Sequence, residues 1–281
     1  FDELLKISGL SHGTDVWLGN AKDLIDNGTC TLKSVIGCRD DIMVYLLHKG
    51  LRPKLAFTIM ESVRKGKGLK DEWIPEMKAN GVEDWYIDSC LKIKYMFPKA
   101  HATAYVMMAI RIAWFKVHRP QVYYCMFFSI RCDAYDIETM IKGEQAIRRR
   151  MQEISDMLKN NETKKDVSKK DKDTFNTLEL ALEMNLRGYY FTNIDIMRSA
   201  SREFIVDPEN ANYIIPPFTS IDGLGENVAD TVVEARKQGA FLSKEDLQRR
   251  TALSGTLVKK MESMGVLEGM QDENQMSLFS F

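Results

Sequence analysis

Apolar residues recur at the three- and four-residue spacing of an α-helix along most of this sequence, and the prolines that would interrupt helices are scarce. Seven prolines in 281 residues leave room for long helices. The pattern is clearest in residues 40–48, 136–158 and 174–187. The sequence therefore predicts a mainly α fold, and with 44% hydrophobic residues it can form about two domains with buried cores.

The pattern changes after Arg187, where short aromatic and β-branched pieces replace the helical runs. The strings GYYFTNIDI, REFIVD and NYIIP predict a small α/β linker with a few strands in residues 188–215. Residues 160–173, NNETKKDVSKKDKD, are typical of a solvated loop, and a helix extension is also compatible with them. The expected organisation is a helical region in 1–187, the connecting strands, a second helical region in 216–270 and a tail in 271–281.

Residues 216–270 contain two helix-turn-helix units, and each has a glycine turn. The turns are Gly223-Leu224-Gly225 and Ser254-Gly255. The first turn resembles the hairpin of helix-hairpin-helix modules, where glycines let the backbone approach a phosphate closely without an intervening Cβ, so these turns are candidate phosphate contacts. A turn of this kind is weak evidence by itself, since many merely connect helices. Ser243 with Asp246 predicts a helix start, and Gly239 and Gly265 predict helix ends.

The segment 91–132 holds seven Lys and Arg residues and no acidic residue, although the whole chain has a net charge of −1. Lys99, His101 and Tyr105 lie at the start of its predicted helix, where a polyphosphate could bind to a point charge, a donor and a stacking ring. The alternative is a core tyrosine, a satisfied buried histidine and a solvated lysine. The apolar stretch 100–117 contains His101, Arg111 and Lys116, which favours a buried helix over a membrane span.

A glycine-punctuated basic loop, VRKGKG, spans residues 63–68. Its Arg64, Lys65 and Lys67 could contact a nucleic-acid backbone, and a solvated loop is the alternative. In contrast, the run 148–150 is at helical spacing from Glu144 and Glu153 and predicts a salt-bridged exposed face.

Five cysteines are scattered along the chain, and none forms a CxxC pair. This pattern argues against a disulfide framework and a zinc site and favours a reducing compartment such as the cytoplasm. The chain begins at Phe1 in the middle of a pattern, so we expect it to be a piece of a longer protein.

Three strings, FPKAHATAYVMMAIRIAWFKVHRP, SGLSHGTDVW and VRKGKG, resemble the fingers region of C-family DNA polymerases, the bacterial polymerase III alpha subunits, with the PolC type nearest. The resemblance implies a helical polymerase fingers region followed by a tandem helix-hairpin-helix domain. It implies that Lys99 and His101 bind phosphates of the incoming dNTP and that Tyr105 lies near the sugar or base. It also implies that Ser11, His12 and Gly13 lie near the active-site cleft. A turn supported by glycines is the alternative for that string.

The tail residues Gln275, Met276, Ser277, Leu278 and Phe279 resemble the pentapeptide by which bacterial polymerases hold the sliding clamp. Met276 departs from the commoner leucine. A glutamine amide and two apolar anchors are enough for an extended peptide to bind a pocket. A disordered terminus is the alternative.

The resemblance further implies a replicative DNA-directed DNA polymerase acting in chromosomal replication, with primer–template DNA, the clamp and other replisome subunits as partners. Transfer of a nucleotide needs carboxylates that hold Mg²⁺, but Asp40-Asp41 and Asp71-Glu72 match no palm motif, so we expect no catalytic or metal-binding residue in this chain. The Mg²⁺ ligands would lie in the parent enzyme. Two rival readings are a non-enzymatic helix-hairpin-helix adaptor that recruits the clamp, and a helical scaffold protein.

Overall fold

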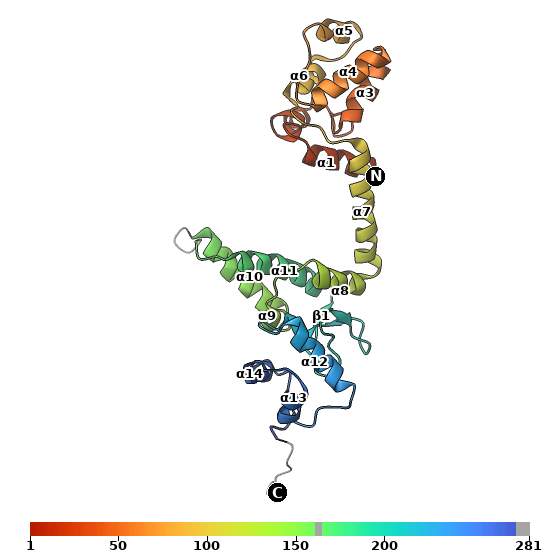
Figure 1. Cartoon of the computed structure of the whole chain (residues 1–281). Helices are drawn as coiled ribbons and strands as arrows, with labels where there is room; N and C mark the ends of the chain where they lie inside the picture. The colour runs from red at the N-terminus through yellow and green to blue at the C-terminus, as the bar shows by residue number, and fades with distance from the viewer. Residues whose placement is uncertain (161–164, 274–281) are drawn as a thin grey trace. The chain divides into compact units, whose positions relative to one another are not determined.

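The computed structural model describes residues 1–160 and 165–273, and the chain divides into two compact units, Phe1–Ala113 and Trp114–Phe281 (Figure 1). Most described residues are helical and one small sheet lies in the second unit, which confirms the predicted mainly α class.

The first unit is a cluster of helices around one core. Buried Ile42, Leu46, Ile59, Met77 and Ile93 come from four different helices or their ends. The tightest pair in the unit is α3 with α4, and Pro53, whose missing N–H costs nothing at a helix start, opens α4. The elements of this unit are α1 (Asp2–His12), the π-helical turn η1 (Trp17–Ala21), α2 (Lys22–Asp26), α3 (Arg39–His48), α4 (Pro53–Arg64), α5 (Trp73–Ala79), α6 (Asp84–Lys92) and the first part of α7 (Lys99–His118).

Helix α7 carries the apolar stretch 100–117, and the prediction that it is a buried helix is wrong. Within α7 only Ala102 and Val106 are buried, while large side chains such as Trp114 and Val117 are exposed. The residue pattern showed how apolar the helix is, but could not show whether another element covers it. Among the residues that the structure describes, no helix is both long enough and apolar enough to span a membrane.

The second unit contains a larger core rich in aromatic rings, among them Tyr124, Phe128, Phe191 and Phe204. Its elements are α8 (Pro120–Ile130), α9 (Ile137–Met140), α10 (Glu144–Lys159), α11 (Lys169–Leu186), β1 (Tyr190–Phe191), β2 (Ile205–Val206), β3 (Tyr213–Ile215), the 3-10 turn η2 (Phe218–Ser220), α12 (Glu226–Arg236), α13 (Lys244–Arg250) and α14 (Gly255–Ser263).

Two helix predictions in this unit need adjustment. The run 136–158 is divided between α9 and α10 because Gly143 has φ of 82°, a left-handed conformation that ends one helix before the next begins. The end of the predicted loop 160–173 is helical, since Ser168 caps α11 by accepting a hydrogen bond from the N–H of Asp171. The salt-bridged face of α10 is confirmed by pairs such as Arg148 with Glu144 at 2.8 Å.

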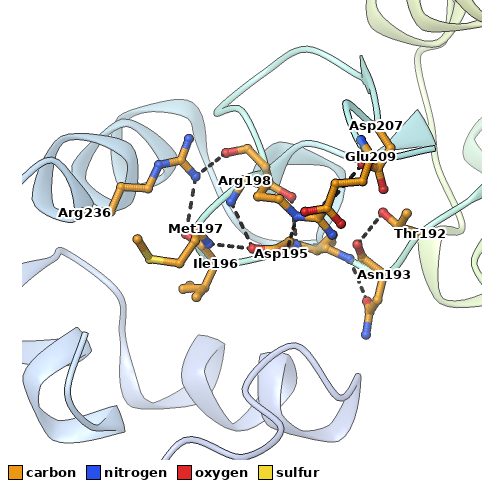
Figure 2. Close-up of polar contacts among 11 residues, drawn as sticks. Thr192, Asn193, Asp195, Ile196, Met197, Arg198, Asp207, Glu209 and Arg236 are labelled. Carbon is orange, nitrogen blue, oxygen red and sulfur yellow. Dashed lines mark hydrogen bonds and ion pairs between the residues drawn. The ribbon is translucent and has the colours of Figure 1, made fainter. Parts of the chain in front are cut away.

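The predicted strands form a three-stranded sheet in which β3 is central. It pairs in parallel with β1, with Tyr190 opposite Tyr213, and antiparallel with β2, with Val206 opposite Ile214. A polar network stabilises the loop between β1 and β2 (Figure 2). Arg198 pairs with Asp195 at 2.7 Å and with the buried Asp207 at 3.1 Å.

The same network joins the strand region to the helices that follow. Arg236, in the last turn of α12, donates hydrogen bonds to the carbonyl oxygens of Ile196 at 3.3 Å and Ser199 at 2.7 Å (Figure 2). Burial lowers the pKa of Arg236 from its ordinary value, because its charge has lost part of its water shell. The loop between β1 and β2 therefore holds the last turn of α12, the helix that follows the glycine hairpin.

All five cysteines are free thiols, and Cys38, Cys90 and Cys125 are buried. Burial raises the pKa of Cys38 and of Cys125 to about 12, and it also raises the pKa of Cys90. These thiols are therefore uncharged packing groups.

Candidate nucleotide and nucleic-acid interface

The end of α1 and the start of α7 meet in a cluster of four rings centred on Phe97. The ring centroid of Phe97 lies 4.8 Å from that of His12, in stacked geometry, and 5.9 Å from those of His101 and Tyr105. His12 also stacks on Tyr105 at 5.8 Å. The structure thus brings together two of the strings singled out in the sequence, and His12 is 85 residues from Phe97 along the chain.

Local backbone contacts hold this end of α1 in place. His12 is the last residue of the helix, and its Nδ1 lies 2.7 Å from the carbonyl oxygen of Ser8. The hydroxyl of Ser11 donates to the same oxygen at 3.0 Å. The next residue, Gly13, has no room for a side chain, because a Cβ would lie 2.4 Å from Val16 Cγ2. The hydroxyl of Ser11 also lies 3.0 Å from Nδ1 of His12, so Ser11 contacts the histidine directly, and Gly13 allows the close packing of Val16.

A short antiparallel bridge then connects the two strings. The N–H of Thr14 donates to the carbonyl oxygen of Tyr95 at 3.0 Å, and the N–H of Lys94 donates to that of Thr14 at 3.1 Å. This bridge fixes the segment immediately before Phe97 against the end of α1.

Lys99 opens α7, and its side chain is exposed. Its backbone N–H donates to the carboxylate of Asp40 at 2.8 Å, so this donor at the helix start already has an acceptor. Tyr105 is 59% exposed and lines an open hollow of about 490 Å³ together with His101 and Met108. An anionic ligand would therefore meet the side chains of Lys99 and His101 here rather than that backbone N–H.

The basic loop is partly neutralised by an acid that the sequence analysis did not single out. Glu61 accepts two hydrogen bonds from Arg64, at 2.9 and 2.8 Å, and pairs with Lys65 at 3.2 Å. The hydrogen bonds from Arg64 are the largest cause that lowers the pKa of Glu61 to about 2. Lys67 is exposed. Glu61 precedes Arg64 and Lys65 by three and four residues, and this helical spacing was the signal available in the sequence.

The first hairpin connects η2 to α12. Gly223 has φ of 85°, and nothing lies within 4 Å of the position that its Cβ would take. Leu224 points into the core at 3% exposure, and Gly225 caps α12, again with open space beside it. The turn is therefore anchored by one side chain and presents bare backbone on its outer side, as a close approach to phosphate requires.

The second hairpin connects α13 to α14. Ser243 caps α13, and Ser254 caps α14 by accepting a hydrogen bond from the N–H of Leu257, which confirms both predicted helix starts. Asp246 is buried in this unit, where its carboxylate accepts from Arg249 at 2.6 Å and Arg250 at 3.1 Å. Gly255 has ordinary backbone angles, so the second turn does not require glycine for conformation.

The acidic pairs of this chain do not fit a magnesium site. Asp41 pairs with Lys6 at 2.6 Å and accepts two backbone N–H groups at the start of α3, and Asp40 accepts from Lys99. Glu72 pairs with Lys70 at 3.5 Å. Asp40, Asp41 and Glu72 thus each contact a lysine or a backbone N–H, and Asp71 is exposed.

Residues 275–279, the predicted clamp peptide, lie outside the described residues. Sequence reasoning missed Phe97 as a cluster residue. Its spacing of four from His101 in a helix-forming string was a signal, but the contact with His12 depends on the tertiary fold.

Comparison with known proteins shows which proteins the chain is similar to. Residues 1–81 match the family described as the bacterial DNA polymerase III alpha subunit finger domain, and residues 188–276 match the helix-hairpin-helix motif. Over 99% of the chain, it is 58% identical to the PolC-type DNA polymerase III of Oceanobacillus iheyensis and 59% identical to that of Bacillus subtilis. The protein of the same name from Streptococcus pneumoniae is 58% identical over the same share. The chain covers 19% of the length of each of these relatives. Over nearly its whole length, the chain is therefore similar to a segment of PolC-type DNA polymerase III, and it contains regions that match the finger-domain and helix-hairpin-helix families.

Proposed function

We propose that this chain is the part of a bacterial replicative DNA polymerase that holds the incoming deoxynucleotide, the duplex DNA and the sliding clamp, while other segments of the parent enzyme supply the catalytic carboxylates. The observation that carries the proposal is the identity of 58–59% to PolC-type polymerases over 99% of the chain. The parent activity is DNA-directed transfer of deoxynucleotides, with Mg²⁺ held by residues outside this chain.

The ring cluster is the proposed nucleotide site. Lys99 and His101 would bind the phosphates, and Tyr105 would lie beside the sugar or base, where an exposed ring can stack. His12 would hold the ring of Tyr105 in place, since the two rings stack with their centroids 5.8 Å apart. Ser11 and Gly13 belong to the site as the neighbours of His12, which Ser11 contacts directly. A non-enzymatic adaptor would have no use for this arrangement.

The two glycine hairpins and the basic loop are the proposed DNA contacts. Gly223, Leu224 and Gly225 would bring bare backbone to one phosphate, and Ser254 with Gly255 would do so at another. Arg64, Lys65 and Lys67 would add charge along the backbone. Contacts to phosphates do not read bases, so binding would be independent of sequence and steeply dependent on salt.

The remaining assignments follow from the proposed role. Gln275, Met276, Ser277, Leu278 and Phe279 would bind the sliding clamp, and the parent would assemble with other replisome subunits. A polymerase that copies chromosomal DNA acts in the cytoplasm, at the nucleoid.

The proposal can be tested by duplex binding to this chain. Replacing Gly223 and Gly225 with valine should weaken binding about tenfold at low salt, because the backbone can no longer approach a phosphate. Fluorescence anisotropy with a labelled duplex at several salt concentrations measures the effect.

The matched control is Gly188→Val. Gly188 also has open space around it and φ of 83°, so valine imposes a similar backbone strain away from the hairpin. Equal affinity of the hairpin variant and the control would remove the first hairpin from the proposed DNA interface.

A further inference from the structure

Two lysines from distant parts of the second unit converge on the residue that leads into the first hairpin. Asp222 precedes Gly223, and its carboxylate pairs with Lys170 of α11 at 2.7 Å. Lys260 of α14 donates to the backbone carbonyl of Asp222 at 3.3 Å and lies 4.0 Å from its carboxylate. The hydrogen bond from Lys170 is the largest cause that lowers the pKa of Asp222 below its ordinary value.

These groups line a polar hollow of about 330 Å³ beside the hairpin. Its charged lining consists of Asp136, Glu138, Arg150, Lys170, Asp171, Asp222 and Lys260, so three cations face four carboxylates. The three cations differ in the carboxylates that they contact. Arg150, whose side chain is 33% exposed, lies 3.3 Å from Asp136 and 3.7 Å from Asp171. Lys260 lies 3.7 Å from Glu138, and Lys170 pairs with Asp222 beside the hairpin.

We propose that Lys170 and Lys260 are DNA-phosphate contacts of the first hairpin and that Asp222 competes with the phosphate for them. This inference rests on the proposed function of the hairpin and adds two binding residues and one opposing residue to it. In the absence of DNA the Asp222 carboxylate takes the place of the anion. When a backbone phosphate reaches the outer side of Gly223 and Gly225, the ammonium groups turn to it.

Replacing the Asp222 carboxylate with a phosphate costs little free energy, because the ion pair between Lys170 and Asp222 is exposed. The side chains of Lys170 and Asp222 are 61% and 69% exposed, and ion pairs in water add little stability. A duplex offers a dense row of phosphates and releases counterions when a lysine replaces them. Asp222 stays next to the bound phosphate, so its charge lowers affinity. The hairpin therefore binds DNA with lower affinity than it would without Asp222, as a protein that moves along DNA requires.

The test uses this chain, a fluorescently labelled duplex and four single variants. Asp222→Asn should bind the duplex about threefold to tenfold more tightly at low salt, since it removes a repelling charge and releases Lys170. Lys170→Gln and Lys260→Gln should each weaken binding, and each should reduce the slope of log affinity against log salt by about one.

Glu234→Gln is the matched control for Asp222→Asn. Glu234 pairs at 2.5 Å with Lys237, the residue that follows α12, and the two side chains are 67% and 64% exposed, so the variant removes the same charge from a similar pair. It should change affinity less than Asp222→Asn does. Circular dichroism and thermal unfolding of each variant report whether the fold is retained.

The double variant Lys170→Gln with Asp222→Asn separates the two parts of the proposal. Removing Asp222 should gain less affinity when Lys170 is already absent, because only the more distant Lys260 is left for it to release. Equal gains in the two backgrounds would overturn the competition between Asp222 and phosphate.

Two binding results distinguish wrong lysine contacts from a wrong DNA-binding function. In the first result, the unaltered chain binds duplex, and the Gly223 and Gly225 variant loses affinity as proposed. If the Lys170, Lys260 and Asp222 variants then have the affinity of the Glu234→Gln control, only the lysine contacts are wrong. If the unaltered chain does not bind duplex at low salt, the proposed DNA-binding function itself is wrong.

Discussion

At the scale of single residues, Asp41 illustrates how a largely buried carboxylate can stay charged. Burial raises its pKa, but Lys6 at 2.6 Å and the backbone N–H groups of Gly37 at 2.9 Å and Cys38 at 3.1 Å lower it by more, so the pKa of Asp41 is below its ordinary value. The charged form is thus favoured by folding. The contacts join α1 to the start of α3.

Replacing Asp41 with asparagine should reduce the free energy of unfolding by about 1–3 kcal/mol at pH 7, because Lys6 and two N–H groups lose a charged acceptor. A carboxylate with a lowered folded-state pKa stabilises the fold above its unfolded-state pKa of about 4 and loses this effect as pH falls through the folded pKa. As the pH falls from about 5 through the folded-state pKa of Asp41, the variant should therefore lose less stability than the unaltered chain.

Urea unfolding at a series of pH values measures this difference. Asp71→Asn, at an exposed position, is the control and should leave both the stability and its pH dependence nearly unchanged. Parallel pH profiles for the parent chain and the Asp41 variant would contradict the assignment.

Lys99 and His101 carry a prediction about the parent enzyme. Alanine at either position should raise KM for deoxynucleotides or lower kcat, reducing kcat/KM by roughly a factor of ten to a hundred, because a charge-assisted phosphate contact is lost. Affinity for primer–template should barely change. Lys54→Ala provides the control, since Lys54 is also exposed near a helix start. Unchanged steady-state kinetics for both site variants would disprove the proposed nucleotide contacts.

At the scale of elements, the turns after α4 and α5 show two different requirements for glycine. Gly66 and Gly81 have nearly the same left-handed conformation, with φ of 69° and 72°. A Cβ at Gly66 would lie 2.3 Å from the carbonyl oxygen of Lys94, whereas nothing lies within 4 Å at Gly81. The first glycine is needed for both conformation and space, the second for conformation alone.

Alanine at Gly81 should therefore cost about 1–2 kcal/mol of stability, the usual cost of a left-handed residue. Alanine at Gly66 should cost roughly 2–4 kcal/mol, because the backbone of Lys94 must also move. Chemical denaturation of the two variants compares them directly. Similar losses of stability in the two variants would mean that the backbone around Lys94 moves without a cost in free energy.

The helix and strand pattern was largely predictable because it depends on local chemistry. Ser243 and Ser254 cap helices as their side chains suggest, and the aromatic pieces after Arg187 form strands. Exposure of α7 was not predictable, since burial depends on which elements lie opposite a helix. For the site, the sequence pointed to His12, His101 and Tyr105 separately. Their meeting around Phe97 required the bridge between Thr14 and Tyr95, which no local pattern indicates.

At the scale of the whole molecule, each unit has a core of its own. One core is built around residues such as Ile42 and Met77, and the other around residues such as Phe128 and Phe218. The proposed nucleotide cluster belongs to the first unit, and both hairpins belong to the second. A change in one site can therefore be made without disturbing the core that supports the other.

The tail prediction also concerns the whole chain. Deleting residues 275–281 should abolish binding to the sliding clamp, because Leu278 and Phe279 are the proposed anchors and Gln275 sets their orientation. DNA affinity without clamp should be unchanged, since the deleted residues include no lysine or arginine. Surface plasmon resonance on immobilised clamp measures the first effect. If a peptide of residues 272–281 fails to compete with the chain for clamp, the binding site lies elsewhere.

The buried thiols give each unit its own reporter of opening. Cys90 lies in the core of the first unit and Cys125 in that of the second. An alkylating reagent reacts with a thiolate that it can reach, so a buried, uncharged thiol is modified only when its surroundings open. The alkylation rates of Cys90 and Cys125 in one sample, followed by mass spectrometry of peptides, would therefore show whether the two cores open together or independently.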